Sequence, residues 1–165
     1  MAHEKLEVTI RMADRKDSRT VAEFIRGLAE FEKLAHEMVA TEELVIKNVF
    51  ENKYAEVLIA ESSGMPVGYA LFFHNFSTFL SKPGIYLEDL FVKPEFRGKG
   101  VGKRLLVRLA RIAKERDCGR FEWAVLNWNK GAIDFYESLG AKAMDEWTVY
   151  RLTGAGLDAV ADLEA

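Results

Sequence analysis

The chain has 165 residues, of which 49% are hydrophobic and 12% aromatic, and its formal net charge is -3 at pH 7. This size and composition predict a single domain over residues 1–165 with a packed core, and they exclude a disordered chain. The slightly acidic balance argues against nucleic acid as a partner, and no apolar run is long enough to span a membrane.

The first third of the chain predicts one strand and two helices. Leu6–Met12 alternates loosely and predicts a strand, which a turn with capping residues at Asp14–Asp17 follows. A second, shorter helix is predicted from an N-cap at Thr41 to about Phe50. Apolar residues at helical spacing predict the first, longer helix between them; they are Val21, Phe24, Ile25, Leu28 and Phe31.

A hairpin and a loop come next. Ala55–Glu61 and Val67–His74 are predicted strands, and Ser62-Ser63-Gly64 is the turn between them. The polar and aromatic residues of Asn75–Gly84 predict a loop. Because that loop immediately precedes the most informative strand of the chain, we consider it a candidate functional loop.

The central stretch joins a strand to a helix through glycines. Ile85–Val92 predicts a buried strand, which must stop near Lys93 because Pro94 cannot donate to a sheet. The glycine-rich run Arg97–Gly102 leads directly into a helical pattern. The apolar face of that helix carries Leu105, Leu106, Leu109, Ile112 and Ala113.

This connection predicts an anion site. The first turn of a helix leaves backbone N–H groups without partners, and glycines let a bulky anion approach them. Arg97, Lys99 and Lys103 add positive charge. The alternative is a plain connection whose glycines only shape the turn, but three glycines at alternate positions among cations favour the anion site.

Two common phosphate motifs fail here. A P-loop requires glycine where Arg97 stands and serine or threonine where Arg104 stands. The dinucleotide fingerprint requires a third glycine at the position of Lys103. The pattern that fits is Arg-x-x-Gly-x-Gly.

The last third predicts alternating strands and helices, and the whole order of elements predicts an α+β or α/β fold with a mixed sheet. Asn129 is the predicted N-cap of a helix that Gly140 closes. The predicted elements are a turn at Asp117–Gly119, a strand at Phe121–Val125, a helix at Lys130–Leu139, a strand at Trp147–Leu152 and a weak helix at Leu157–Leu163.

Cysteine and histidine usage indicates the compartment and argues against a metal. Cys118 is alone, so an internal disulfide is impossible, and Met1–Ile10 lacks the apolar core of a signal peptide. We therefore expect a cytoplasmic protein. His3, His36 and His74 show no metal-ligand spacing, so we expect no metal.

Two stretches resemble one enzyme superfamily. With Leu90-Phe91-Val92 and Pro94 before it, the Arg97–Gly102 run resembles the acetyl-CoA-binding motif of the GNAT superfamily of N-acetyltransferases. Asn127–Ala141, with Phe135-Tyr136 on a helix, resembles a second GNAT pattern. The resemblance implies an α/β-type GNAT fold, with a mixed, centrally splayed sheet flanked by helices, and acetyl-CoA as cosubstrate.

The resemblance also implies roles for individual residues. The pantetheine arm lies between the strands at 85–92 and 121–125, and Asn129 bonds the cosubstrate. Tyr136 protonates the departing thiolate as general acid. The residues alone favour a simpler explanation, in which Asn129 does no more than cap the helix and Tyr136 does no more than pack in the core. The implied cosubstrate-binding residues are Leu90, Phe91, Val92, Arg97, Gly98, Lys99, Gly100, Val101, Gly102, Lys103, Asn129 and Tyr136.

Two adjacent acids are candidates for the general base. Glu88 and Asp89 lie inside the apolar run, where unpaired acids are costly. Neighbours on a strand point to opposite faces, so at most one serves directly. The alternative is that one of them makes a structural hydrogen bond or ion pair.

A closer resemblance is to the spermidine/spermine (diamine) acetyltransferase family. It rests on Tyr86–Val92, the Arg97–Gly102 turn, Trp128-Asn129 before the Phe-Tyr helix, and Leu28–Glu32, where Phe31 stands for that family's tyrosine. It implies Glu88 as the base, acting through water, direct attack by a primary amine in a ternary complex, and a homodimer. The implied acceptor-binding residues are Phe31, Glu88, Asp89, Trp128, Asp145 and Glu146.

The acceptor itself stays open at this point. Phe31 lacks the hydroxyl of the family's tyrosine, and the loop at 75–84 differs in sequence. A polyamine or diamine, thialysine or another lysine-like amine, an aminoglycoside and a peptide amine are the candidates. A binding module that holds acyl-CoA without transferring it is the competing hypothesis, and no role follows for residues 154–165.

Overall fold

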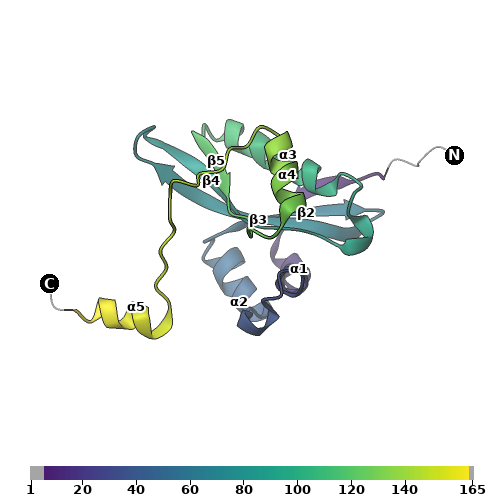
Figure 1. The fold of residues 1–165 in the computed structure, drawn as a ribbon. Coiled ribbons are helices and arrows are strands. Elements are labelled where there is room, and N and C mark those ends of the chain that lie inside the picture. Colours follow the sequence, from purple (N-terminus) through teal and green to yellow (C-terminus); the bar gives the residue numbers. More distant parts are fainter. Residues whose placement is uncertain (1–5, 164–165) are drawn as a thin grey trace. The chain divides into compact units, whose positions relative to one another are not determined.

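The computed structural model describes residues 6–163. In this part of the chain, five strands form one sheet in the order β1-β2-β3-β4-β5 (Figure 1). All neighbouring strands are antiparallel except β4 and β5, which run parallel, so the predicted fold with a mixed sheet is confirmed. The strands are β1 (Thr9–Met12), β2 (Glu56–Ser62), β3 (Met65–Ser77), β4 (Lys82–Val92) and β5 (Arg120–Trp123).

The helices are distributed over two compact units, Met1–Ala124 and Val125–Ala165. The first unit contains α1 (Ser18–Phe31), α2 (Glu42–Val45) and α3 (Val101–Glu115), and the second contains α4 (Lys130–Ser138) and α5 (Gly154–Ala161). Thr41 caps α2 as predicted, since its Oγ1 accepts from Leu44 N at 3.3 Å. The predicted second helix then continues as a π-helical turn over Ile46–Glu51.

Helices cover both faces of the sheet in the first unit. α1 and α2 lie on one face and α3 lies on the other (Figure 1). Alternate residues of β2 therefore enter different cores. α3 buries Leu105, Leu109 and Ile112 among its apolar residues. The buried cluster on the α1 side comprises Val21, Phe24, Val45, Val57, Ile59, Tyr69 and Phe91.

The β3–β4 hairpin is longer than predicted, which corrects the predicted loop at Asn75–Gly84. Asn75 pairs with Gly84 and Ser77 pairs with Lys82, so only residues 78–81 connect the two strands. A side chain at Gly84 would collide with Asn75 Oδ1, which explains the glycine. The sequence prediction failed because strand pairing across the hairpin outweighs the poor local strand propensity of these residues.

The predicted last strand at Trp147–Leu152 is wrong. No β-ladder of the described residues includes this segment. Residues that favour strands do not by themselves make one, because the backbone also needs a partner for its hydrogen bonds. The weak terminal helix is confirmed but lies earlier than predicted, at α5. Within residues 6–163, none of the helices has the length and apolar character that a membrane span needs.

Candidate active site

The connection between β4 and α3 is built around two glycines in the left-handed region. Gly98 has φ +72° and Gly100 has φ +81°, and Gly100 is the N-cap residue of α3. No side chain among the described residues caps this helix. The N–H groups of its first turn are therefore available to an acceptor from outside the chain. The predicted strand, glycine turn and helix are confirmed.

Neither the backbone conformation nor the packing of the described residues requires glycine at position 102. The φ of Gly102 is not in the left-handed region, and among the described residues a Cβ atom there would meet only Val92 Cγ2, at 3.9 Å. Glycine inside a helix costs about 1 kcal/mol relative to alanine. The close approach of a ligand to the first turn of α3 would explain this residue.

β4 leaves one edge open next to this connection. β5 pairs with β4 only from Gly84 to Leu87, while β4 continues to Val92. Lys93 N donates to Val67 O of β3 at 2.9 Å. Because backbone groups alternate in direction along a strand, those of Leu90 and Val92 point away from β3. No strand of the described residues pairs with β4 there, and the splay that the resemblance implies stays a prediction.

Arg97 turns back onto β4 and α1. Its Nε donates to Val92 O at 2.9 Å. Its guanidinium carbon lies 4.5 Å from the ring centroid of Phe31 and 5.4 Å from that of Phe91. The predicted role of Arg97 in binding the cosubstrate stays a prediction, since the side chain has other contacts in this structure.

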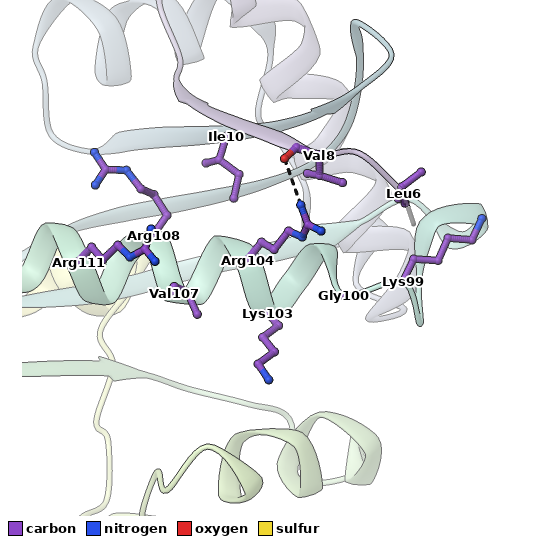
Figure 2. Close-up of a pocket in the computed structure, with 10 residues that line it drawn as sticks. All are labelled: Leu6, Val8, Ile10, Lys99, Gly100, Lys103, Arg104, Val107, Arg108 and Arg111. Carbon is purple, nitrogen blue, oxygen red and sulfur yellow. Dashed lines mark hydrogen bonds between the residues drawn. The ribbon is translucent and has the colours of Figure 1, made fainter. Parts of the chain in front are cut away.

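A positively charged groove of about 630 Å³ runs along α3 from the glycine connection. Figure 2 shows α3 on one side of it and, on the other, the N-terminal segment with Leu6, Val8 and Ile10 that leads into β1. Arg104 Nη1 donates to Val8 O across the groove at 3.3 Å, and Lys103 projects from the opposite side of the helix (Figure 2). The cationic lining residues are Lys99, Lys103, Arg104, Arg108 and Arg111, and none of the lining residues within 6–163 is acidic.

Tyr69 forms a hydrogen bond with Asp89, one of the two candidate bases. Its hydroxyl donates to Asp89 Oδ2 at 2.6 Å, and its buried ring stacks on Phe24 with 5.2 Å between centroids. Burial raises the pKa of Asp89, and the hydrogen bond from Tyr69 opposes that rise. Burial and the charge of Asp89 raise the pKa of Tyr69 well above its ordinary value. Asp89 therefore makes a structural hydrogen bond, which is the alternative to a role as base that the sequence allowed for one of the two acids.

Glu88 occupies a β-bulge. Leu71 pairs with Asp89 but Phe72 pairs with Leu87, so Glu88 is the extra residue of β4 at this point. A bulge redirects a side chain relative to its neighbours, and Glu88 is exposed whereas Asp89 is half-buried. The prediction that the two acids point to opposite faces assumed regular alternation, which the bulge interrupts here, so it stays a prediction that at most one of them serves directly.

Glu32 is a third acid that sequence reasoning missed. It follows Phe31 at the end of α1. Burial raises the pKa of Glu32, and the charge of Asp89 raises it further. Glu32 and Glu88 also contribute to the raised pKa of Tyr69. The three carboxylates thus lie within electrostatic reach of Tyr69, an arrangement that favours a cationic ligand. The available signal was the Leu28–Glu32 motif, whose last residue is this acid.

The other predicted site residues lie in the second unit. Asn129 Oδ1 accepts from Ala132 N at 3.3 Å, so the predicted cap of α4 is confirmed. Tyr136 is on α4, with its ring centroid 5.5 Å from that of Phe135. Gly140 follows the helix with φ +86°. Trp128 precedes the cap, and Asp145 and Glu146 form a turn beyond the helix.

The two units thus carry different sets of the predicted residues. The first unit holds Phe31, Glu88, Asp89, Leu90, Phe91, Val92 and the run from Arg97 to Lys103. The second unit holds Trp128, Asn129, Tyr136, Asp145 and Glu146.

Known proteins resemble this chain over most of its length. The profile of the acetyltransferase (GNAT) family matches residues 22–141. A thialysine N-epsilon-acetyltransferase of Sus scrofa is 38% identical, over 91% of this chain and 95% of that protein. The L-ornithine N5-acetyltransferase NATA1 of Arabidopsis thaliana is 32% identical, over 92% and 86%. A solved integron cassette protein from the mobile metagenome of V. cholerae has a TM-score of 0.81 at 28% identity, over 94% and 98%.

Proposed function

The chain belongs to the acetyltransferase (GNAT) family, and on that premise we propose that it moves the acetyl group of acetyl-CoA to a primary amine of a small acceptor. The observation that carries the proposal is the N-terminus of α3, an uncapped helix end opened by glycines beside the open edge of β4. Relatives named thialysine and L-ornithine acetyltransferases support an amine as the acceptor.

The residues of the first unit fit acetyl-CoA, which supplies the reactive thioester. Backbone amides from Gly98 to Lys103 would hold the diphosphate, and the ammonium groups of Lys99 and Lys103 would balance its charge. Backbone groups of Leu90 and Val92 would bind the pantetheine arm at the open edge of β4. Asn129 of the second unit would add a further hydrogen bond.

Two side chains would serve as the general base and the general acid of the reaction. Glu88 would take a proton from the acceptor amine through water, so that the nitrogen attacks the thioester carbonyl directly in a ternary complex. The Tyr136 phenol would give a proton to the departing thiolate, because a phenol with a pKa of about 10 is protonated at neutral pH. Asp89 is engaged by Tyr69 and is the weaker candidate for the base.

The acidic surroundings of β4 favour a cationic acceptor. Glu32, Glu88 and Asp89 contribute negative charge around Tyr69. Phe31 is partly exposed and offers an apolar wall at the end of α1. We propose a short, lysine-like ω-amine such as thialysine as the first acceptor to test. The further proposed acceptor-binding residues are Trp128, Asp145 and Glu146.

The test is a screen for thiol release from acetyl-CoA over thialysine, ornithine, lysine, spermidine, an aminoglycoside and a lysine peptide. We expect turnover with thialysine or ornithine at kcat/KM at least tenfold above the peptide and the aminoglycoside. Calorimetry with CoA runs in parallel. CoA binding without acetylation of any amine would instead favour an acyl-CoA-binding module, and absence of CoA binding would refute both functions.

Three coarser features complete the proposal. We propose one catalytic domain, since the family profile covers both sides of the boundary between Ala124 and Val125. The homodimer rests on the family resemblance, and sedimentation equilibrium tests it. The cytoplasmic location rests on the lone Cys118, and fractionation of cells tests it.

A further inference from the structure

One side chain in the first unit connects the open edge of β4 to the end of α1. Arg97 donates from Nε to the carbonyl of Val92, which is one of the backbone groups at that edge. The same guanidinium lies over the ring of Phe31, at 4.5 Å, and near that of Phe91, at 5.4 Å. Arg97 thus contacts both the edge of β4 proposed to bind the cosubstrate and the Phe31 ring, which is the proposed acceptor wall.

The packing of α1 explains why Phe31 comes within reach. A Cβ atom at Gly27 would lie 2.8 Å from Cζ of Phe91, so this glycine lets α1 approach β4 closely. Phe31 comes one helical turn later, at the last position of α1, and remains 39% exposed. The guanidinium of Arg97 therefore covers part of a ring that is only partly buried by the fold.

The neighbouring cation of the same turn behaves differently. Lys99 Nζ lies 5.4 Å from the ring of Phe96, within its own loop, and Lys99 lines the positively charged groove along α3. The two cations of the turn are thus directed to different parts of the first unit. Lys99 suits a phosphate, whereas Arg97 already has a hydrogen bond and an aromatic contact.

We propose that Arg97 is a positioning residue for the acceptor wall: it holds the Phe31 ring against the end of β4 and thereby sets which amines the site accepts. The inference rests on the proposed function. It differs from the role that the sequence motif suggests, since neutralising a phosphate would need only the charge of Arg97. Positioning needs the planar fork, which stacks on a ring and donates from Nε at the same time.

The experiment compares Arg97→Gln and Arg97→Lys with Lys99→Gln as the contrasting variant from the same turn. Calorimetry gives the Kd for CoA, and initial rates give kcat and KM for thialysine and ornithine. Loss of a stacking contact at an exposed site corresponds to a change of about two- to fivefold, and loss of the hydrogen bond as well extends it to about tenfold. We expect both Arg97 variants to lower amine kcat/KM by about that factor, with the Kd for CoA within about threefold of wild type.

Lys99→Gln should show the reverse pattern, a weaker Kd for CoA at an unchanged amine KM. Phe31→Leu should lower amine kcat/KM by itself and should remove the further effect of Arg97→Gln, because both act through one contact. Additive effects of the two substitutions would contradict the inference.

Two outcomes overturn the inference while leaving the proposed function intact. One is a tenfold weaker Kd for CoA in Arg97→Gln with unchanged amine kinetics, and the other is full recovery in Arg97→Lys. A wild-type protein that neither binds CoA nor acetylates an amine refutes the proposed function itself, and with it the inference.

Discussion

Replacing Tyr69 by phenylalanine tests the hydrogen bond between Tyr69 and Asp89, which joins β3 to β4 beside the proposed base Glu88. Phenylalanine keeps the ring and its stacking on Phe24, at 5.2 Å, and removes only the hydroxyl that donates to Asp89 Oδ2 at 2.6 Å. A hydrogen bond to a charged group contributes about 1.5–3 kcal/mol, so we expect Tyr69→Phe to lower the free energy of unfolding by about 2 kcal/mol at pH 7.5.

The size of this loss depends on pH in a defined direction. Burial raises the pKa of Asp89 above its ordinary value of 3.8, and the Tyr69 hydroxyl opposes the rise. A group with a raised folded-state pKa contributes stability that is present below its unfolded-state pKa and is lost as pH rises through the folded-state pKa. Removing the hydroxyl raises the pKa of Asp89 further. The loss should therefore shrink toward about 1 kcal/mol as pH falls from 7.5 to 4, because the carboxyl becomes increasingly protonated.

Urea unfolding at pH 4 and pH 7.5, followed by circular dichroism, measures both values. With an m-value of about 2 kcal/mol/M, a loss of about 2 kcal/mol moves the midpoint by about 1 M. Asp89→Asn is the matched background, because a carboxamide accepts the same hydrogen bond without a charge. Tyr69→Phe should there cost about 1 kcal/mol at both pH values. A loss below about 0.5 kcal/mol at pH 7.5, or one independent of pH in the wild-type background, would refute the reasoning.

Three further variants address the proposed chemistry. The variant Gly102→Val should fold with α3 intact, as measured by circular dichroism. It should weaken CoA binding about tenfold or more in calorimetry, because the valine side chain fills the approach to the helix end. Unchanged affinity would mean that the ligand does not approach Gly102. Glu88→Gln should lower kcat/KM about 10²-fold and abolish the rising limb of the pH–rate profile, and a retained limb would assign the base elsewhere. Tyr136→Phe should lower kcat about 10²-fold with CoA affinity within about threefold of wild type, and undiminished turnover would exclude Tyr136 as the acid.

The parts of the fold that depend on neighbouring residues were predictable. The strand, the glycine turn and α3 follow one another in the chain, so Pro94, Gly98 and Gly100 define the connection without help from distant residues. The cap of α4 by Asn129 is equally local and was also predicted.

What the sequence did not reveal depends on pairing between distant residues. The hairpin extends to Ser77 and Lys82 because β3 and β4 support each other, and the bulge at Glu88 is visible only from their register. Trp147–Leu152 is rich in residues that favour strands but has no partner strand among the described residues. The hydrogen bond from Tyr69 to Asp89 likewise joins two strands, and no local motif indicates it.

The central claim is that the amides at the start of α3 hold the diphosphate of acetyl-CoA. The most direct measurement is a titration of the nitrogen-15-labelled protein with CoA, followed by backbone amide chemical shifts. We predict that the amides from Gly98 to Lys103 shift most among residues 6–124, and that inorganic pyrophosphate reproduces part of their shifts. Saturation by CoA with these amides unmoved, or no saturation at millimolar CoA, would contradict the claim.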